Sequence, residues 1–322
     1  MIDWEKMPGL VEELEEVDSC IARTLQSKQK FLITTLEELM QAGGKRLRPV
    51  LLLLSGRFGD YQAEKLIPLA AIIEILHMAT LVHDDIIDDA RLRRGHRTVQ
   101  SRWGKDIAVF TGDFLFSNAF FLLTQNASFE YLQKAAMAIR KICEGEIDQY
   151  HSRYDIHITL KQYLKRISFK TAILFALSCQ IGAQESKCQP RDEWHLRNIG
   201  GNLGMAFQIT DDILNFQGQE SIIGKPVGND LVQGVYTLPL VYALSRAEYH
   251  LELEELLAKS IYEQEDISHI IDIVVDSGGI TFSQKIVKQY HDKALKHIRA
   301  LRESPARMML EEMVEELTLR QY

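Results

Sequence analysis

Aspartates that follow an apolar segment are the first residues whose type and spacing could do chemistry. Four of them come after residues 69–82: Asp84, Asp85, Asp88 and Asp89. On a helix, Asp84 and Asp88 share one face, with a rise of about 6 Å between them. Because like charges repel at this spacing and are costly to desolvate, we expect a cation beside them, and carboxylate oxygens suit Mg²⁺. The alternative is a solvated acidic helix end that binds nothing.

A second aspartate cluster repeats this arrangement further along the chain. Asp211 and Asp212 follow the nearly uncharged segment GGNLGMAFQIT, residues 200–210. Mg²⁺ in proteins typically pairs one or two carboxylates with the phosphates of a substrate. Two such clusters therefore predict a shared site in which several Mg²⁺ ions bridge the protein to a polyanion.

Basic side chains occur where a polyphosphate would need them. Arginine forks bind phosphate oxygens through paired hydrogen bonds, and lysine acts as a point charge. Neither a Walker loop nor a GxGxxG after a strand is present, so a nucleotide-binding fold gets little support. For the first basic group, a solvated surface loop is the alternative. The candidates are Lys45, Arg46 and Arg48; Arg91, Arg93, Arg94 and Arg97; Lys170 with Thr171; and Lys225.

Charge and cysteine content exclude several classes of protein. The chain of 322 residues carries a net charge of −8, which argues against a general nucleic-acid binder. Its four cysteines show no CxxC pair or zinc spacing and are interpreted as reduced thiols. The acidic start lacks the order of a signal peptide. Residues 66–82 contain Pro68, Glu74 and His77, so they predict a buried helix rather than a membrane span. We expect a cytoplasmic protein.

The elements that must position these residues are predicted to be helices. None of the seven prolines lies between Pro68 and Pro190, and apolar residues there recur at spacings of three and four. Alternating strand patterns are sparse. One all-α domain over residues 1–322, with ten or more helices, is therefore expected, and two smaller domains are the alternative. Breaks are predicted at residues 43–44, 56–60, 94–95, 184–190, 217–230 and 277–279.

The sequence resembles the trans-isoprenyl (polyprenyl) diphosphate synthases over nearly its whole length. Two longer segments, EILHMATLVHDDIIDDARLRRG and GKPVGNDLVQGVYTLPLVYAL, look like the catalytic component II of two-component heptaprenyl diphosphate synthases. Six motifs in order carry the resemblance: GGKRLRP at 43–49, DDIIDDARLRRG at 84–95, GE at 145–146, KT at 170–171, FQITDD at 207–212 and GKPVGNDL at 224–231.

This resemblance implies a helical fold around a deep central cavity and Mg²⁺-dependent chain elongation, with about three ions per site. The allylic diphosphate ionises, isopentenyl diphosphate attacks the carbocation, and the released diphosphate takes the proton. Cations aimed at the departing diphosphate stabilise that step. By position, the metal ligands are Asp84, Asp88 and Asp211, supported by Asp85 and Asp212; the allylic diphosphate meets Arg93, Lys170, Thr171, Gln208 and Lys225; and isopentenyl diphosphate meets Lys45, Arg48, His77 and Arg94.

One position departs from the family pattern. The second motif usually ends in aspartate, whereas this chain has Asn215, which keeps an acceptor oxygen but loses the charge. We expect retained activity with a somewhat raised Mg²⁺ requirement. A class I terpene cyclase would have Ser at 215 and Glu at 219, where this chain has Asn215 and Gln219. A non-catalytic regulatory subunit with degenerate motifs is the other alternative, and Asn215 is its only support.

Product length depends on the residues that precede the first motif. Short-chain members of the family block this path with aromatic residues where this chain has the small Thr80 and Ala79, with Leu76 and Ile73 deeper. Because each helical turn adds about 5.4 Å of depth, we expect a product of about six to eight isoprene units. The alternative is that Ala79 only packs against another helix.

The resemblance also implies partners. The family is dimeric, so we expect either a homodimer or a heterodimer with a small non-catalytic subunit. No nucleic-acid partner is expected. The lipid product suggests transient membrane association during release, and its use as a quinone side chain, as in menaquinone, follows from the family alone.

Overall fold

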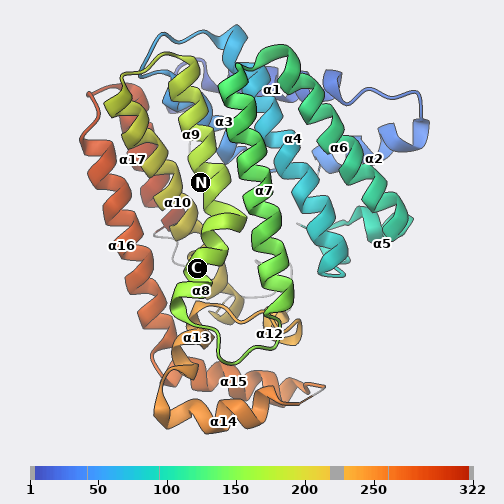
Figure 1. Ribbon diagram of the computed structural model, residues 1–322, viewed down its shortest axis with the longest axis vertical. Helices are drawn as coiled ribbons and strands as arrows, with labels where there is room; N and C mark the ends of the chain where they lie inside the picture. Colours follow the sequence, from blue (N-terminus) through green and yellow to red (C-terminus); the bar gives the residue numbers. More distant parts are fainter. Residues whose placement is uncertain (1–3, 42, 94, 218–227, 260, 319–322) are drawn as a thin grey trace. The chain divides into compact units, whose positions relative to one another are not determined.

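The computed structural model describes residues 4–41, 43–93, 95–217, 228–259 and 261–318 (Figure 1). The described chain is almost entirely helical, which confirms the predicted fold class. Two compact units can be distinguished. Unit 1 comprises residues 1–137, 174–200 and 297–313, and unit 2 comprises residues 138–173, 201–296 and 314–322. The single domain over residues 1–322 stays a prediction.

Unit 1 contains most of the N-terminal helices and one short hairpin. Helices α7 (Phe129–His151), α10 (Pro190–Gln217), α16 (Gly279–Arg299) and α17 (Pro305–Thr318) hold residues of both units. The other elements of unit 1 are η1 (Trp4–Lys6), α1 (Leu10–Thr24), α2 (Lys30–Gln41), α3 (Leu47–Gly56), α4 (Ala63–Ile87), β1 (Leu92–Arg93), β2 (His96–Arg97), α5 (Val99–Trp103), α6 (Lys105–Asn126) and nearly all of α9 (Ile173–Glu185).

Helix α4 is the core helix of unit 1 and ends in the first aspartate motif. Most of its apolar side chains between Leu66 and Val82 are buried, on all sides of the helix, as predicted for residues 66–82. Helix α6 packs along it, as Figure 1 shows. A side chain at Gly112 would place its Cβ 2.2 Å from His83 Nε2, so a larger residue at this position would require the His83 ring to move. Both α4 and α6 are long and apolar enough to cross a membrane, but 72% of the apolar window of α4 is buried against 33% for α6.

Unit 2 surrounds the second aspartate motif with apolar side chains. Residues Met205, Ile209, Ile213 and Phe216 form one stripe of α10 at helical spacing and belong to its core. Helices α13, α14 and α15 pack on one another, as Figure 1 shows. The elements that lie wholly in unit 2 are α8 (Leu160–Ile167), the π-helical turn η2 (Ser168–Ala172), α12 (Asn229–Val232), α13 (Leu238–Leu244), α14 (Ala247–Leu257) and α15 (Gln264–Asp276).

Most predicted breaks coincide with helix ends. Helix α2 ends before residues 43–44, α3 ends at Gly56, α9 and α10 flank residues 186–189, and α15 and α16 flank residues 277–278. The break at 217–230 falls largely on residues 218–227, which lie outside the described residues. The β1–β2 hairpin was not predicted, because its two-residue strands are too short for an alternating pattern. All four cysteines are free thiols, as expected.

Candidate functional site

The basic segment of unit 1 lies at the start of α3. Lys45 is exposed, whereas Arg46 and Arg48 are half-buried. Arg46 is the residue that precedes the helix, and its backbone is left-handed with φ 47°. Its Nε donates to Asp18 Oδ1 and its Nη1 to Glu74 Oε1, both over 2.9 Å. Arg48 instead places its guanidinium carbon 4.6 Å from the ring centre of Phe175, a cation–π contact.

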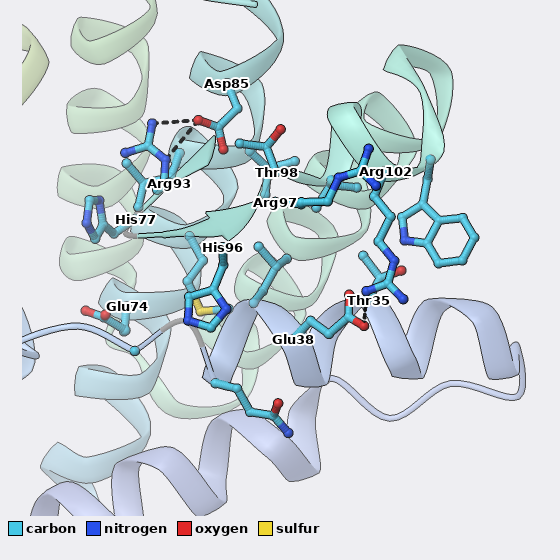
Figure 2. Close-up of a pocket in the computed structure, with 18 of the residues that line it drawn as sticks. Thr35, Glu38, Glu74, His77, Asp85, Arg93, His96, Arg97, Thr98 and Arg102 are labelled. Carbon is cyan, nitrogen blue, oxygen red and sulfur yellow. Dashed lines mark hydrogen bonds and ion pairs between the residues drawn. The ribbon is translucent and has the colours of Figure 1, made fainter. Parts of the chain in front are cut away.

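The first aspartate motif occupies the last turn of α4. Asp84 and Asp88 are half-buried, and the backbone N–H of Asp88 donates to the carbonyl oxygen of Asp84 over 2.8 Å, so both belong to one helical turn. Asp85 points the other way and is 4% exposed. Its Oδ1 accepts from Arg93 Nε over 2.9 Å and lies 2.8 Å from Arg93 Nη2, as Figure 2 shows. The hairpin β1–β2 thus presents Arg93 to the buried carboxylate.

A cavity of about 440 Å³ opens beside this motif within unit 1. Five residues singled out in the sequence line it: Arg46, His77, Asp85, Arg93 and Arg97. Figure 2 shows that its other charged side chains come from α2, α4, the hairpin and α5. Sequence reasoning missed several of these, because nothing in their spacing marks them as neighbours. They include Glu38, Glu74, His96 and Arg102, of which Glu38 and Arg102 form an ion pair. The uncharged Trp103 also lines the cavity.

The second aspartate motif, in unit 2, also has one buried carboxylate. Asp211 is exposed, whereas Asp212 is 4% exposed. The hydroxyl of Tyr163 donates to Asp212 Oδ2 over 2.5 Å, and Gln208 Nε2 donates to Oδ1 over 2.9 Å. Thr171 Oγ1 donates in turn to Gln208 Oε1 over 2.7 Å. Burial raises the pKa of Asp212 to about 7, although the hydrogen bond from Tyr163 acts to lower that pKa.

Lys170 and Thr171 are presented by the π-helical turn η2. Such turns interrupt an α-helix and are frequent at functional sites. Lys170 Nζ lies 2.9 Å from Glu146 Oε1, so the KT and GE motifs of the sequence meet in one ion pair. A side chain at Gly145 would place its Cβ 3.0 Å from Phe169 Cβ. Glycine at this position therefore allows α7 to lie close to η2.

Tyr163 is the residue of this unit that sequence reasoning missed. It is 1% exposed and belongs to no motif. The one available signal was its spacing, because Tyr163 lies two helical turns before Lys170 and so shares its face. Two predicted site residues, Arg94 and Lys225, lie outside the described residues. The predicted joining of the two aspartate clusters in one site stays a prediction.

The predicted product-length residues lie along α4. Ile73, Leu76 and Ala79 are at most 2% exposed, and half-buried Thr80 donates its hydroxyl to the carbonyl oxygen of His77 over 2.8 Å. His83, next to the motif, lies 3.4 Å from Asp113 Oδ1 on α6 through its Nε2 atom, an interaction that joins the two helices.

Residues 29–274 match the family described as polyprenyl synthetase. The chain belongs to this family. It is a prenyltransferase that makes a trans-prenyl diphosphate. The family match thus favours prenyl transfer over the terpene cyclase alternative. The fold agrees, because the chain is similar to the geranylgeranyl pyrophosphate synthase structure of Lactobacillus brevis with a TM-score of 0.93 and 36% identity, covering 98% of this chain and 99% of that one.

Two further polyprenyl synthetase relatives are similar along most of their length. Heptaprenyl diphosphate synthase component 2 of Bacillus subtilis is 38% identical over 301 residues, covering 94% of this chain and 86% of the relative. The structure of a polyprenyl synthase from Caulobacter crescentus, complexed with calcium and isoprenyl diphosphate, has a TM-score of 0.93 and 32% identity and covers 99% of this chain and 98% of that one.

Proposed function

We propose that this chain is a long-chain trans-polyprenyl diphosphate synthase. It adds isopentenyl diphosphate repeatedly to an allylic diphosphate, with farnesyl diphosphate as the expected primer and heptaprenyl diphosphate as the expected product. The observation that carries the proposal is the design shared by the two aspartate motifs. Each has one buried carboxylate fixed by internal hydrogen bonds, Asp85 in unit 1 and Asp212 in unit 2.

The donor set fits Mg²⁺. Asp84, Asp88 and Asp211 offer the hard carboxylate oxygens that this ion prefers. Among the described residues, no group of three or more His, Cys, Asp or Glu side chains could hold a metal by itself. This agrees with an ion that takes one or two carboxylates from the protein and its remaining ligands from substrate phosphates and water. The calcium and isoprenyl diphosphate in the Caulobacter crescentus relative support a site that holds both.

The chain's own residues then bind and orient two diphosphates. Arg93, Lys170, Thr171, Gln208 and Lys225 are assigned to the allylic diphosphate, and Lys45, Arg48, His77 and Arg94 to isopentenyl diphosphate. When bound, Mg²⁺ offsets the negative charge that develops on the departing diphosphate. The allylic C–O bond breaks, the double bond of isopentenyl diphosphate supplies the electron pair of the new C–C bond, and a proton leaves to the released diphosphate. Fixed cations around the leaving group lower the barrier because they are already oriented.

The α4 residues support a long product. Ala79 and Thr80 are small, and the side chains below them, Leu76 and Ile73, are aliphatic. The relatives carry different product names, geranylgeranyl in Lactobacillus brevis and heptaprenyl in Bacillus subtilis, so the family alone does not set the length. We expect Ala79→Phe to shorten the main product by at least one isoprene unit while the chain stays active. An unchanged product distribution in mass spectrometry would remove α4 from the account of product length.

A protein partner is expected on α6. This helix exposes a row of large apolar side chains, with Phe110 at 67% and Phe121 at 62% exposure, and Val109 and Phe120 beside them. An apolar row of this kind is typical of an interface. The partner is either a second copy of this chain or a small non-catalytic subunit, and the word component in the name of the Bacillus subtilis relative supports the second. Cytoplasmic localisation, with transient membrane contact during product release, completes the proposal.

Product analysis tests the proposed function. The purified chain is incubated with Mg²⁺, farnesyl diphosphate and labelled isopentenyl diphosphate, alone and with a candidate small subunit. Long-chain product from the chain alone identifies a self-sufficient enzyme, and long-chain product only with the partner identifies a two-component synthase. No product in either case, with Asn215→Asp also inactive, would contradict the proposal and favour a non-catalytic subunit.

A further inference from the structure

Arg46 is the member of the basic segment that the proposed function leaves without a role. It lies between Lys45 and Arg48, the two residues assigned to isopentenyl diphosphate, yet its side chain contacts acidic residues of other helices. Its guanidinium is engaged by Asp18 of α1 and Glu74 of α4, each over 2.9 Å. With its fork held by carboxylates from two helices, Arg46 links the segment before α3 to α1 and α4.

Glu74 is the stronger of these two anchors. Its side chain is 7% exposed within the apolar core helix α4, whereas that of Asp18 is 43% exposed. The desolvation of a carboxylate buried to this degree must be offset by hydrogen-bond donors or by a cation in direct contact. Arg46, whose side chain is 12% exposed, supplies that cation. The pair is therefore almost wholly shielded from water. Its geometry is better defined than that of an exposed ion pair.

The backbone at Arg46 is adapted to this contact. Its φ of 47° and ψ of 34° are left-handed, an uncommon conformation for a residue other than glycine. The neighbouring Gly43 is also left-handed, with φ 64°. A left-handed residue directly before α3 lets the chain turn between Lys45 and Arg48, so that Arg46 reaches inward while Lys45 stays exposed. The free energy that this conformation costs must be offset by contacts, and the two ion pairs are such contacts.

Glu74 also has a fixed relation to a predicted substrate residue. It lies one helical turn before His77 on α4, so the two side chains share a face, as Figure 2 shows. Both line the same cavity, together with Arg46. The ion pair therefore joins the segment that carries Lys45 and Arg48 to the helical face that carries His77.

We infer that Arg46 and Glu74 are a positioning pair for the binding of isopentenyl diphosphate. The pair fixes the basic segment relative to α4, so that Lys45, Arg48 and His77 meet the diphosphate in a constant geometry. The inference rests on the proposed function, because it concerns that same site. A displacement of about 1 Å in such a group is enough to weaken binding and catalysis strongly.

The test replaces the pair without leaving a buried charge. The double variant Arg46→Met/Glu74→Met replaces the ion pair with two apolar side chains of similar size. Its net charge is unchanged, so the chain is expected to fold. The Michaelis constants for isopentenyl and farnesyl diphosphate are measured separately. We expect the first to rise about tenfold and the second to change less than about twofold. Arg46→Lys, which keeps the charge but loses the fork, should give an intermediate value.

A matched control is available at the other end of α3. Arg57 Nη2 lies 2.7 Å from Glu13 Oε2 of α1, and both side chains are nearly as buried as the Arg46–Glu74 pair, at 16% and 14% exposure. Neither lines the cavity. Arg57→Met/Glu13→Met should lower the melting temperature by a similar amount and leave both Michaelis constants unchanged. If the Michaelis constant for isopentenyl diphosphate rose equally in the two double variants, the effect would be one of general destabilisation and the inference would be overturned.

A third variant separates positioning from direct binding. Glu74→Gln keeps Arg46 and removes only the charge of its anchor, so a positioning role predicts a rise of about threefold in the Michaelis constant for isopentenyl diphosphate. If Arg46 bound the substrate itself, this variant would leave the constant unchanged or lower it, and the inference would be wrong. A wild-type chain that is inactive both alone and with a small subunit would instead overturn the proposed function.

Discussion

The first aspartate motif, on α4 of unit 1, and the second, on α10 of unit 2, each turn one carboxylate inward. Asp85 and Asp212 are both 4% exposed. Their partners differ in charge, because Asp85 is held by the guanidinium of Arg93, whereas Asp212 is held by the hydroxyl of Tyr163 and the amide of Gln208. The same local geometry is thus built once with a cation and once with neutral donors.

This difference has a chemical consequence. A guanidinium offsets the charge of the carboxylate beside it, and the pair can be buried as a unit. Hydroxyl and amide donors satisfy the oxygens of Asp212 but leave its full negative charge in place. Burial accordingly raises the pKa of Asp212 to about 7. The second motif therefore has the greater need of an external cation, which Mg²⁺ would supply when bound.

Two matched substitutions, one in each motif, should separate the two motifs most clearly. Asp85→Asn leaves Arg93 beside a neutral amide, so we expect a loss of about 10²–10³-fold in kcat/KM. Asp212→Asn keeps a side chain that can still hydrogen bond to Tyr163 and Gln208, and we expect a loss of about tenfold. Steady-state kinetics of the two variants measure these losses. Asp89→Asn, at an exposed position, is the control and is expected to stay near wild type. Equal losses at 85 and 212 would mean that the charge of the partner does not matter.

The hydroxyl of Tyr163 gives the next largest effect. Tyr163→Phe removes one donor from a buried carboxylate, so we expect the free energy of unfolding at pH 8 to fall by about 1–3 kcal/mol and the Mg²⁺ requirement to rise. Tyr131 is an equally buried tyrosine whose hydroxyl has no hydrogen-bond partner among the described residues. Tyr131→Phe should therefore be nearly neutral in chemical denaturation. If both variants lose the same stability, the Tyr163–Asp212 hydrogen bond contributes nothing specific.

The pH dependence of stability sharpens the same contrast. The pKa of Asp212 is raised from 3.8 to about 7 in the folded chain, so between these values the folded state binds more protons than the unfolded state. This contribution is present at low pH and is lost as the pH rises toward 7. In metal-free buffer, wild type should lose stability relative to Asp212→Asn over this range, by a few kcal/mol in order of magnitude. A constant difference from pH 5 to pH 8 would show that Asp212 titrates normally.

The smallest effect concerns Asn215. Its side chain is half-buried one turn after Asp211, and its backbone carbonyl accepts from the N–H of Gly228 over 3.0 Å. Asn215→Asp adds a carboxylate to the motif that has neutral donors, so we expect the Mg²⁺ concentration for half-maximal activity to fall about twofold. An unchanged Mg²⁺ dependence would remove any role of this position in metal binding.

The helices and the chemistry-bearing motifs could be predicted from the sequence because both are local. Helical spacing of apolar residues marked α4 and α10, and the aspartates that end or follow their apolar stretches stand out in composition alone. The alternation of buried and exposed carboxylates was not predictable in the same way. Asp84 and Asp85 are adjacent and chemically identical, and only packing decides that Asp85 turns inward to Arg93.

The partners that fix these carboxylates could not be predicted, because they come from other elements. Tyr163 and Asp212 are 49 positions apart, and Arg46 and Glu74 are 28 apart. Such contacts depend on how helices pack, and a single sequence does not state which of many tyrosines or arginines will meet a given carboxylate. The β1–β2 hairpin that presents Arg93 was also missed, because two-residue strands carry no periodic signal.

Mg²⁺-dependent binding of inorganic diphosphate tests the central claim most directly, because the proposed function assigns carboxylates of both motifs to Mg²⁺ binding. Calorimetric titration is carried out with and without Mg²⁺ on wild type, Asp84→Ala and Asp211→Ala. Mg²⁺ should tighten binding to wild type about tenfold or more, and each single variant should lose that gain. Asp211→Ala that keeps the full Mg²⁺ effect would show that the second motif takes no part in the site, contradicting the account.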